Sequence, residues 1–200
     1  MANPFVVVIG NVCSGKSTLV KRFATLYSNW YCLPEDLSAN PWLQQNRSVP
    51  ALQSSIFSMG YYARQHFIAS RHPGPVIQES CLQQSSYFPL MLNEIGDISI
   101  DGLKTIQLSY SVFLDALPSP DFYIYLYAPS EIRLARAEFR DEPNRSFSKK
   151  LIPIMQAKLD DWLQNSIKSS TVLQLDTSIV NLTDGRGSLD EIYAAINSHL

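Results

Sequence analysis

A glycine-rich segment near the start of the chain has the residue types and spacing of a phosphate-binding loop. It reads Gly10-Asn-Val-Cys-Ser-Gly15-Lys16-Ser17-Thr18, which fits the pattern of a glycine, four residues and then Gly-Lys-Ser/Thr. The glycines let backbone N–H groups turn inward around a polyphosphate, and the N-terminus of a following helix adds partial positive charge. Lys16 can reach the β- and γ-phosphates, while the Ser17 hydroxyl suits Mg²⁺. The segment therefore predicts binding of a nucleoside triphosphate, through Gly10, Asn11, Ser14, Gly15, Lys16, Ser17 and Thr18.

Two carboxylates follow apolar runs further along the chain. Glu35 comes soon after Trp30–Leu33, and Glu79 comes directly after Val76–Gln78. Phosphoryl transfer to a hydroxyl needs a carboxylate that takes the hydroxyl proton, together with acidic or hydroxyl ligands for Mg²⁺. By position alone, Glu35 is either that base or a solvated turn residue. Glu79 is a Mg²⁺ partner, an acceptor-site carboxylate or a cap where a strand turns into a helix.

Four arginines gather in the last third of the chain, at Arg133, Arg136, Arg140 and Arg145. The first three recur at spacings of three and four, so they share one face of a helix. Arginines that close over a transferring phosphoryl group stabilise its charge and exclude water. We predict such a lid over approximately residues 137–147, with Arg136 and Arg140 acting on the phosphoryl group, and we expect Arg133 on a solvated face.

The elements that would position these side chains alternate between apolar β-runs and longer helical stretches, which is typical of an α/β domain with a parallel sheet. Predicted strands are Phe5–Ile9, Trp30–Leu33, Val76–Gln78, Phe122–Tyr127 and Val172–Leu175. Predicted helices are Ser17–Leu26, Ser54–Arg71, Gln84–Glu94, Leu103–Leu117, Pro129–Phe139, Phe147–Asn165 and Ser188–Leu200. Ligands of such sheets lie beyond the carboxyl ends of the strands, so both carboxylates are expected near the phosphate loop. We expect one domain spanning residues 1–200.

Composition limits the classes of partner. A formal charge of −2 over 200 residues gives no global basic field for nucleic acid. No apolar run approaches the roughly 18 residues that a membrane span needs. The three cysteines form no CxxC or Cys/His cluster, which favours free thiols in a reducing compartment. The chain enters its first strand within four residues, leaving no room for a signal peptide. We expect a cytoplasmic protein with no nucleic-acid or membrane partner.

In this order the motifs resemble those of the deoxynucleoside kinase family, which phosphorylates the 5′-hydroxyl of deoxynucleosides. The loop at Gly10–Thr18 is similar to the family's Gly-Asn-x-Gly-Ser-Gly-Lys-Ser-Thr. Glu35-Asp-Leu, followed by Asn40-Pro-Trp-Leu, looks like the family's Glu-Pro-Val and Asn-Pro-aromatic-Leu. Arg136 and Arg140 are similar to the Arg-x-x-x-Arg of its lid. The resemblance covers nearly the whole chain.

The resemblance implies a P-loop kinase fold, a three-layer sandwich with a five-stranded parallel sheet in the order 2-3-1-4-5 and helices on both faces. It implies Glu35 as the general base, Arg136 and Arg140 as lid arginines, and Glu79 as a further acidic residue of the catalytic set. Ser17 and Glu79 would be the Mg²⁺ ligands. ATP would be the phosphoryl donor, a nucleoside the acceptor, and the protein a homodimer.

Two positions depart from the family's pattern. Its Asp/Glu-Arg-Ser triplet reads Gln78-Glu79-Ser80, so no arginine stands there, and Met59 or a neighbour occupies the place of its base-reading glutamine. Gln83, Gln84 or backbone groups would then read the base. Two alternatives stay open. One is a nucleoside monophosphate kinase, for which Arg47, Arg64 and Arg71 are the nearby cations. The other is a nucleotide-binding protein with reduced or lost phosphotransfer.

Overall fold

The computed structural model describes residues 3–42, 51–139, 145–166, 171–183 and 187–199. Its strands are β1 (Phe5–Gly10), β2 (Tyr31–Leu33), β3 (Val76–Glu79), β4 (Phe122–Tyr127) and β5 (Val172–Asp176). Its helices are α1 (Lys16–Leu26), α2 (Ala51–Arg71), α3 (Leu82–Ser85), α4 (Phe88–Glu94), α5 (Ile100–Ala116), α6 (Ser130–Phe139), α7 (Arg145–Ser166) and α8 (Gly187–His199). None of the described helices is long and apolar enough to cross a membrane.

The strands form one parallel sheet in the order β2-β3-β1-β4-β5. This confirms the expected α/β fold and strand order. β1 is central and all six of its residues are buried, because helices cover both faces of a parallel sheet and leave neither face to water. In the register of the sheet, Val8 of β1 lies beside Glu79 of β3, and Gly10 lies beside Leu126 of β4. The carboxyl ends of these strands therefore meet at one edge.

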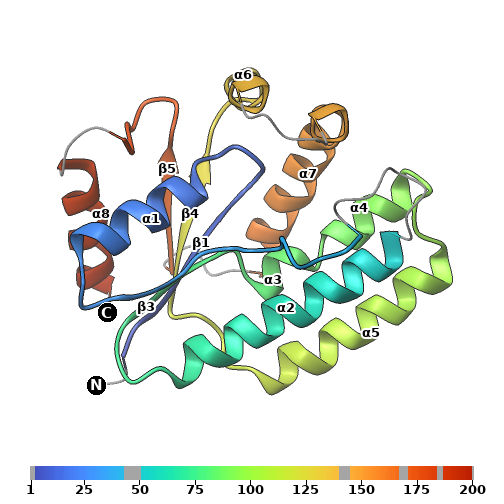
Figure 1. Cartoon of the computed structure of the whole chain (residues 1–200), viewed down its shortest axis with the longest axis horizontal. Helices are drawn as coiled ribbons and strands as arrows, with labels where there is room; N and C mark the ends of the chain where they lie inside the picture. The colour runs from blue at the N-terminus through green and yellow to red at the C-terminus, as the bar shows by residue number, and fades with distance from the viewer. Residues whose placement is uncertain (1–2, 43–50, 140–144, 167–170, 184–186, 200) are drawn as a thin grey trace.

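The two faces of β1 belong to different apolar clusters. Val6 and Val8 pack with residues of α1 and α8, whereas Val7 and Ile9 pack with residues of α2, α4, α5 and α7. Figure 1 shows α1 and α8 on one side of the sheet and the larger group of helices on the other. The result is the predicted three-layer arrangement, with the phosphate loop between the layers at the carboxyl edge.

The helix predicted over Gln84–Glu94 is divided into α3 and α4. Pro89 lies in the first turn of α4. Its ring would clash with the carbonyl of Ser85 in an unbroken helix, so the chain restarts at this point. The Cys81 sulfur caps α3 by accepting a hydrogen bond from the Gln84 amide. The break places Ser85 and Tyr87 at a cavity described below.

The expectation that Arg133 lies on a solvated face is wrong. Its side chain is only 1% exposed. It turns back toward the end of β4, where Nε donates to the Ala128 carbonyl at 2.9 Å and Nη2 to the Ser130 hydroxyl at 3.2 Å. Burial lowers the pKa of this guanidinium. Arg133 therefore holds the junction between β4 and α6 together.

Candidate functional site

The backbone of the phosphate loop requires glycine at both fixed positions. Gly10 has a φ of 150°, and a Cβ there would lie 2.5 Å from the Leu126 carbonyl oxygen. Gly15 has a φ of 102° and precedes α1 without any side-chain cap. Residues with a side chain rarely adopt these angles, whereas glycine adopts them freely. The two glycines therefore let the loop turn tightly and leave the first amides of α1 open to an anion.

Lysine and asparagine side chains hold the loop in shape. Lys16 Nζ donates to the Asn11 carbonyl at 3.2 Å. The buried Asn11 side chain accepts from the Val12 amide at 2.7 Å and donates to the Ile152 carbonyl of α7 at 2.9 Å. The ammonium group of Lys16 thus lies folded over the loop, where it could meet a phosphate, and the loop is fixed to α7.

Glu79 links the loop to the segment after β2. Its Oε1 accepts a hydrogen bond from the Ser17 hydroxyl at 2.5 Å, and its Oε2 accepts one from the Glu35 amide at 3.1 Å. Glu79 is 4% exposed. A buried carboxylate beside a serine hydroxyl offers the hard oxygen ligands that Mg²⁺ prefers.

The sheet register explains why Glu79, and not Gln78, reaches Ser17. Glu79 pairs with Val8, which faces α1, and successive side chains of a strand point to opposite faces. Gln78 faces the other way, and its Nε2 donates to the Ser80 carbonyl at 2.8 Å. If Glu79 is the acidic member of the Asp/Glu-Arg-Ser triplet, the arginine position falls on Ser80. Ser80 adopts a left-handed φ of 59°.

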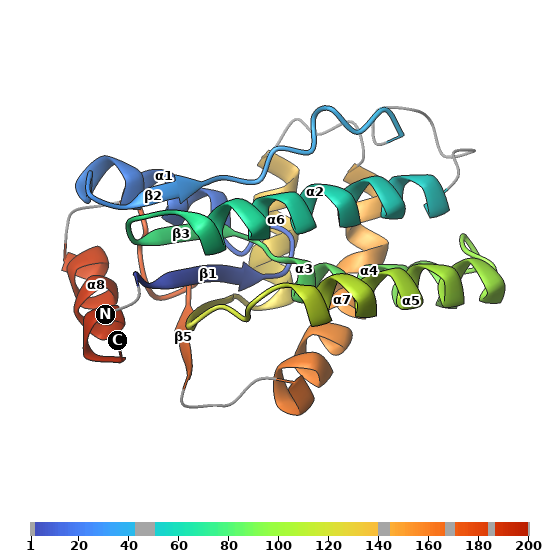
Figure 2. The ribbon, with the colours of Figure 1, turned by 90° about the horizontal axis from the view of Figure 1, so that it is seen from below.

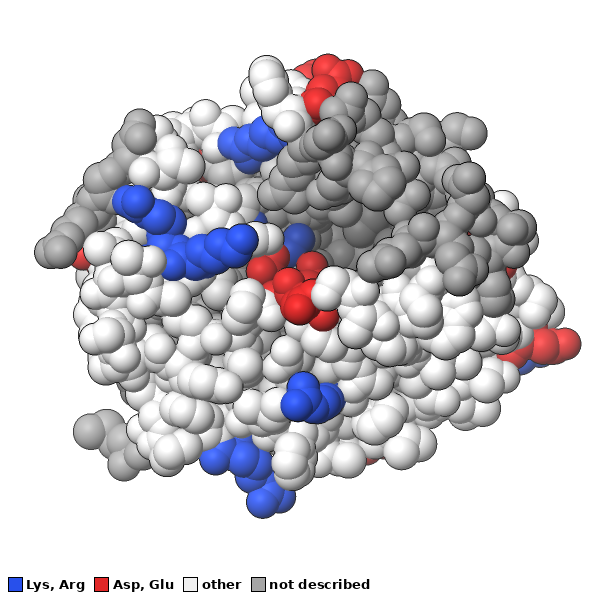
Figure 3. Space-filling model, in the orientation of Figure 1, with Lys and Arg blue, Asp and Glu red and all other residues white. Residues whose placement is uncertain are grey.

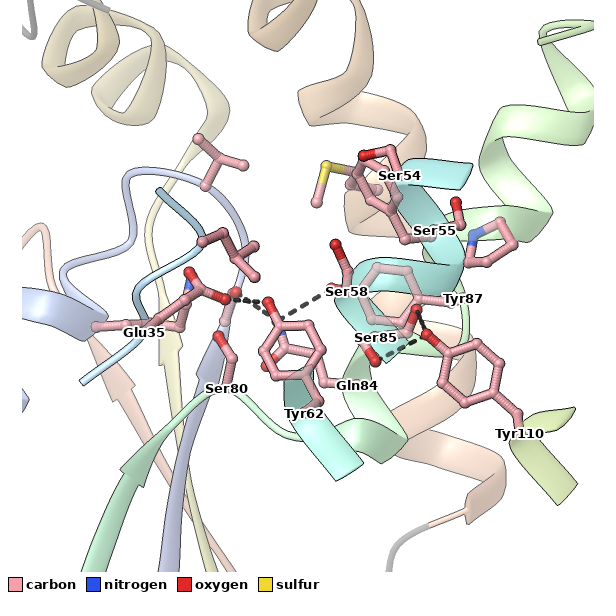
Figure 4. Close-up of a pocket in the computed structure, with 17 residues that line it drawn as sticks. Glu35, Ser54, Ser55, Ser58, Tyr62, Ser80, Gln84, Ser85, Tyr87 and Tyr110 are labelled. Atoms are coloured by element: carbon pink, nitrogen blue, oxygen red, sulfur yellow. Dashed lines mark hydrogen bonds between the residues drawn. The ribbon is translucent and has the colours of Figure 1, made fainter. Parts of the chain in front are cut away.

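A cavity of about 220 Å³ opens beside the phosphate loop, and we call it the Glu35 cavity. Its lining contains Lys16 and Glu35, several serines, a glutamine and three tyrosines. Figure 4 shows Glu35 and Ser80 on one side of it and Ser85 and Tyr110 on the other. In the face seen in Figure 3, acidic and basic side chains stand next to each other at a hollow. The cavity therefore has a charged end and an end with aromatic and hydroxyl groups.

Several hydroxyl and amide groups that line the Glu35 cavity are hydrogen-bonded, whereas Gln84 Oε1 and Ser55 Oγ have no partner among the described residues. Gln84 Nε2 donates to the Gly10 carbonyl at 2.9 Å and to the Tyr87 hydroxyl at 3.2 Å. The Ser85 and Tyr110 hydroxyls lie 2.9 Å apart. Burial raises the pKa of Tyr87 and of Tyr110, so both phenols stay protonated. Of the glutamines considered as base readers, Gln84 lines the cavity, while Met59 lies in the core.

A second cavity, of about 610 Å³, lies on the opposite side of the loop, and we call it the Arg136 cavity. Its lining includes Gly15, Thr18 and Arg136, with Thr177–Thr183 after β5. Arg136 Nη1 donates to the Thr177 hydroxyl at 2.9 Å and to the Cys13 carbonyl at 3.3 Å. The Thr177 hydroxyl also donates to the carbonyl of the buried Ser14 at 2.9 Å. The arrangement clamps the loop between α6 and β5.

Comparison with known proteins identifies the family. The family model for deoxynucleoside kinases matches residues 6–200. The chain belongs to the deoxynucleoside kinase family. It is therefore a phosphotransferase of the P-loop class that acts on deoxynucleosides, with an alcohol group as acceptor.

Solved structures support the fold of this kinase. A deoxyadenosine kinase from M. mycoides with bound dCTP has a TM-score of 0.79 at 16% identity, over 96% of this chain and 98% of that one. The same enzyme with dCMP and a flexible dCDP gives 0.79 at 15% identity, and with dATP it gives 0.77 at 16%, with the same coverage. Comparison with curated protein sequences gives no significant match.

The kinase fold brings most of the sequence-predicted site residues together. Lys16 and Glu35 line the Glu35 cavity, with Ser17 and Glu79 joined beside it. Arg136 lies across the loop, at the other cavity. Arg140 and the centre of the expected lid, residues 140–144, are outside the described residues.

Sequence reasoning missed two residues of the site. Tyr62 of α2 donates a hydrogen bond to Glu35, and Thr177 links Arg136 to the phosphate loop. Thr177 follows β5 at the carboxyl edge, so the rule that placed Glu35 there could also have found it. No sequence pattern marked Tyr62, because its contact spans 27 residues and depends on how α2 packs.

Proposed function

We propose that this chain transfers the γ-phosphoryl group of ATP, with Mg²⁺, to the 5′-hydroxyl of a deoxynucleoside. The observation that carries the proposal is the shared lining of the Glu35 cavity. A carboxylate suited to take a proton and the lysine of a phosphate loop open into the same space. Residues 1–200 would act as one catalytic unit.

The charge of the cavity favours a neutral acceptor. Lys16 is the one cationic side chain among the described residues that line it. Arg64 and Arg71, which a monophosphate kinase could use for the acceptor phosphate, lie on the exposed side of α2. Arg47 lies outside the described residues. The aromatic far end suits a nucleobase, and the relative from M. mycoides has been seen with dCTP and dATP bound.

Ser17 and Glu79 would hold the metal ion. The described residues contain no group of three or more His, Cys, Asp or Glu side chains that could bind a metal by themselves. This fits Mg²⁺, which protein sites often bind through one or two side chains and the phosphates of the substrate. When bound, Mg²⁺ neutralises charge that develops on the phosphate oxygens.

The proposed proton acceptor is Glu35. Its carboxylate would take the proton of the 5′-hydroxyl as the 5′-oxygen forms a bond to the γ-phosphorus. The bond from that phosphorus to the β,γ-bridging oxygen breaks, and ADP leaves. Arg136, with Arg140 from the expected lid, would stabilise the negative charge on the transferring group.

A second copy of the chain is the partner we propose for the outer side of α2 and α5. Leu108 and Val112 of α5 are 69% and 67% exposed, and Phe67 of α2 is 51% exposed. Figure 2 looks onto these two helices lying side by side. An apolar face of this kind suits a homodimer.

We also propose a cytoplasmic location, which suits the free thiols of Cys13, Cys32 and Cys81.

Glu35→Gln tests the chemical part of the proposal. The amide keeps the size of the side chain and cannot accept the proton, so turnover should fall by about 10²-fold or more. Binding of ATP, measured by calorimetry, should stay unchanged, because Glu35 is on the acceptor side of the loop. Turnover within a few-fold of the unmodified enzyme would remove Glu35 from the mechanism.

A further inference from the structure

The Glu35 carboxylate has a side-chain partner that the family's motifs do not include. The Tyr62 hydroxyl of α2 donates a hydrogen bond to Glu35 Oε1 (Figure 4). Glu35 is half-buried, and its backbone amide is held by Glu79. One contact therefore fixes the carboxyl group of Glu35 and a different one fixes its backbone.

Tyr62 is suited to be a permanent donor. Its side chain is 7% exposed. Burial, followed by the nearby Glu35 carboxylate, raises the pKa of the Tyr62 phenol well above its ordinary value. The phenol stays protonated over the working pH range of most enzymes, and its only hydrogen points at Glu35. A hydrogen bond to an ionised acceptor is shorter and stronger than one between neutral groups.

Cationic side chains are scarce around Glu35 in the described structure. Lys16, the one cation among the described residues of the cavity lining, donates to the Asn11 carbonyl. The family's Asp/Glu-Arg-Ser triplet, which Gln78-Glu79-Ser80 resembles, has no arginine in this chain. Within the described structure, Tyr62 is thus the side chain that can orient the Glu35 carboxylate.

We propose that Tyr62 is the positioning residue of Glu35, orienting the carboxylate toward the acceptor hydroxyl through a neutral hydrogen-bond donor. The proposal rests on the proposed role of Glu35 as the general base. It implies that a tyrosine on a neighbouring helix does in this chain what a charged side chain at the end of β3 would otherwise do.

Tyr62→Phe removes the hydroxyl and keeps the ring that fills the core. We expect kcat with Mg·ATP and a deoxynucleoside to fall about tenfold, because the carboxylate is no longer held toward the acceptor hydroxyl. The KM for the deoxynucleoside should change far less, because the lost contact orients the base and does not hold the acceptor. The KM for ATP should not change.

Tyr123→Phe is the matched control. Tyr123 of β4 is buried, packs edge-on against Trp162 and does not line the cavity. Losing its hydroxyl should leave kcat within about twofold of the unmodified enzyme. Thermal unfolding of both variants would reveal any general loss of structure, which would lower the unfolding temperature together with the activity.

Combining the variants separates the proposal from the role of Glu35 itself. In a Glu35→Gln background, Tyr62→Phe should cause no further loss of kcat, since the two side chains act through one contact. An unchanged kcat in Tyr62→Phe, together with a large loss of kcat in Glu35→Gln, would overturn the role of Tyr62 and leave the base intact. Normal turnover in Glu35→Gln would overturn the base.

Discussion

The Ser17 hydroxyl and the Glu79 carboxylate are joined by a hydrogen bond of 2.5 Å that connects the first turn of α1 to the end of β3. The same carboxylate accepts from the Glu35 amide. One buried side chain thus ties together the phosphate loop, the proposed metal ligand and the proposed base. A change at Glu79 should affect the metal requirement, because its carboxylate touches the hydroxyl of Ser17, the other proposed metal ligand.

Glu79→Gln should weaken the use of Mg²⁺. The amide keeps the size of the side chain and loses the negative charge that would attract the cation. We expect the Mg²⁺ concentration for half-maximal turnover to rise by about tenfold or more, the scale seen when groups around a metal are altered. Glu94→Gln is a fitting control, since Glu94 pairs with Lys158 away from the loop. An unchanged Mg²⁺ requirement in Glu79→Gln would exclude Glu79 from the metal site.

Cys13→Gly should stabilise the fold. Cys13 adopts a left-handed φ of 61°, at a position where the family's loop has glycine. This conformation costs a residue with a side chain about 1–2 kcal/mol in the folded state. Glycine removes that cost, but its greater conformational freedom in the unfolded chain offsets part of the gain. We expect a net gain of about 0.5–1 kcal/mol in the free energy of unfolding, measured with urea. Cys13→Ala keeps the Cβ and should bring no gain; equal gains in both variants would contradict the strain.

His66 should make stability depend on pH. The ring is fully buried, its Nε2 contacts the Pro118 carbonyl, and its Nδ1 has no hydrogen-bond partner in the described part of the chain. Burial lowers the pKa of His66 below its ordinary value, so the folded state binds the proton less readily than the unfolded state. The contribution of His66 to the free energy of unfolding should be fully present above about pH 6.5. It should fall as the pH drops below that value, by up to about 1.4 kcal/mol per pH unit.

His66→Gln should flatten this dependence, since the amide can still donate to Pro118 and does not titrate in this range. The measurement is urea unfolding at pH 7.5, 6.5 and 5.5. His72→Gln, at a histidine that bonds Gly74 within its own turn, should keep the slope of the unmodified protein. A slope that survives in His66→Gln would assign the pH dependence to other groups.

Much of the fold could be predicted because the apolar runs are long and well separated. Val6, Val7 and Val8 are buried on both faces of the central strand, which is what an uninterrupted β-branched run indicates. The division between α3 and α4 was missed, although Pro89 marks it. A helical pattern gives weak evidence of a break that falls between two apolar stretches.

The site was harder to predict where one residue decides the face of a strand. Glu79 could be placed near the loop from its position, but whether it or Gln78 faces α1 depends on the sheet register. Arg133 was misplaced because its helical spacing indicates a shared face without telling which way that face points. Tyr62 reaches Glu35 only through the packing of α2, which the order of residues along the chain does not reveal.

Leu108→Lys should weaken the proposed dimer. A charge at the centre of the apolar face of α5 would be buried against its counterpart, at a cost of several kcal/mol if it found no partner. The mass in solution, measured by light scattering after gel filtration, should change from that of two chains to that of one. Ile132→Lys, at an exposed isoleucine on α6, should leave the mass unchanged. An unmodified protein that runs as a monomer would refute the dimer.

Transfer of the labelled γ-phosphate of ATP to a panel of acceptors tests the central claim most directly. The panel holds the four deoxynucleosides, the same compounds lacking the 5′-hydroxyl, and the four deoxynucleoside 5′-monophosphates. We expect Mg²⁺-dependent label in a deoxynucleoside 5′-monophosphate product, none with the compounds that lack the 5′-hydroxyl, and loss of about 10²-fold in Glu35→Gln. Label transferred only to the monophosphate acceptors, which would become labelled diphosphates, would contradict the account. ATP binding without transfer to any acceptor would contradict it as well.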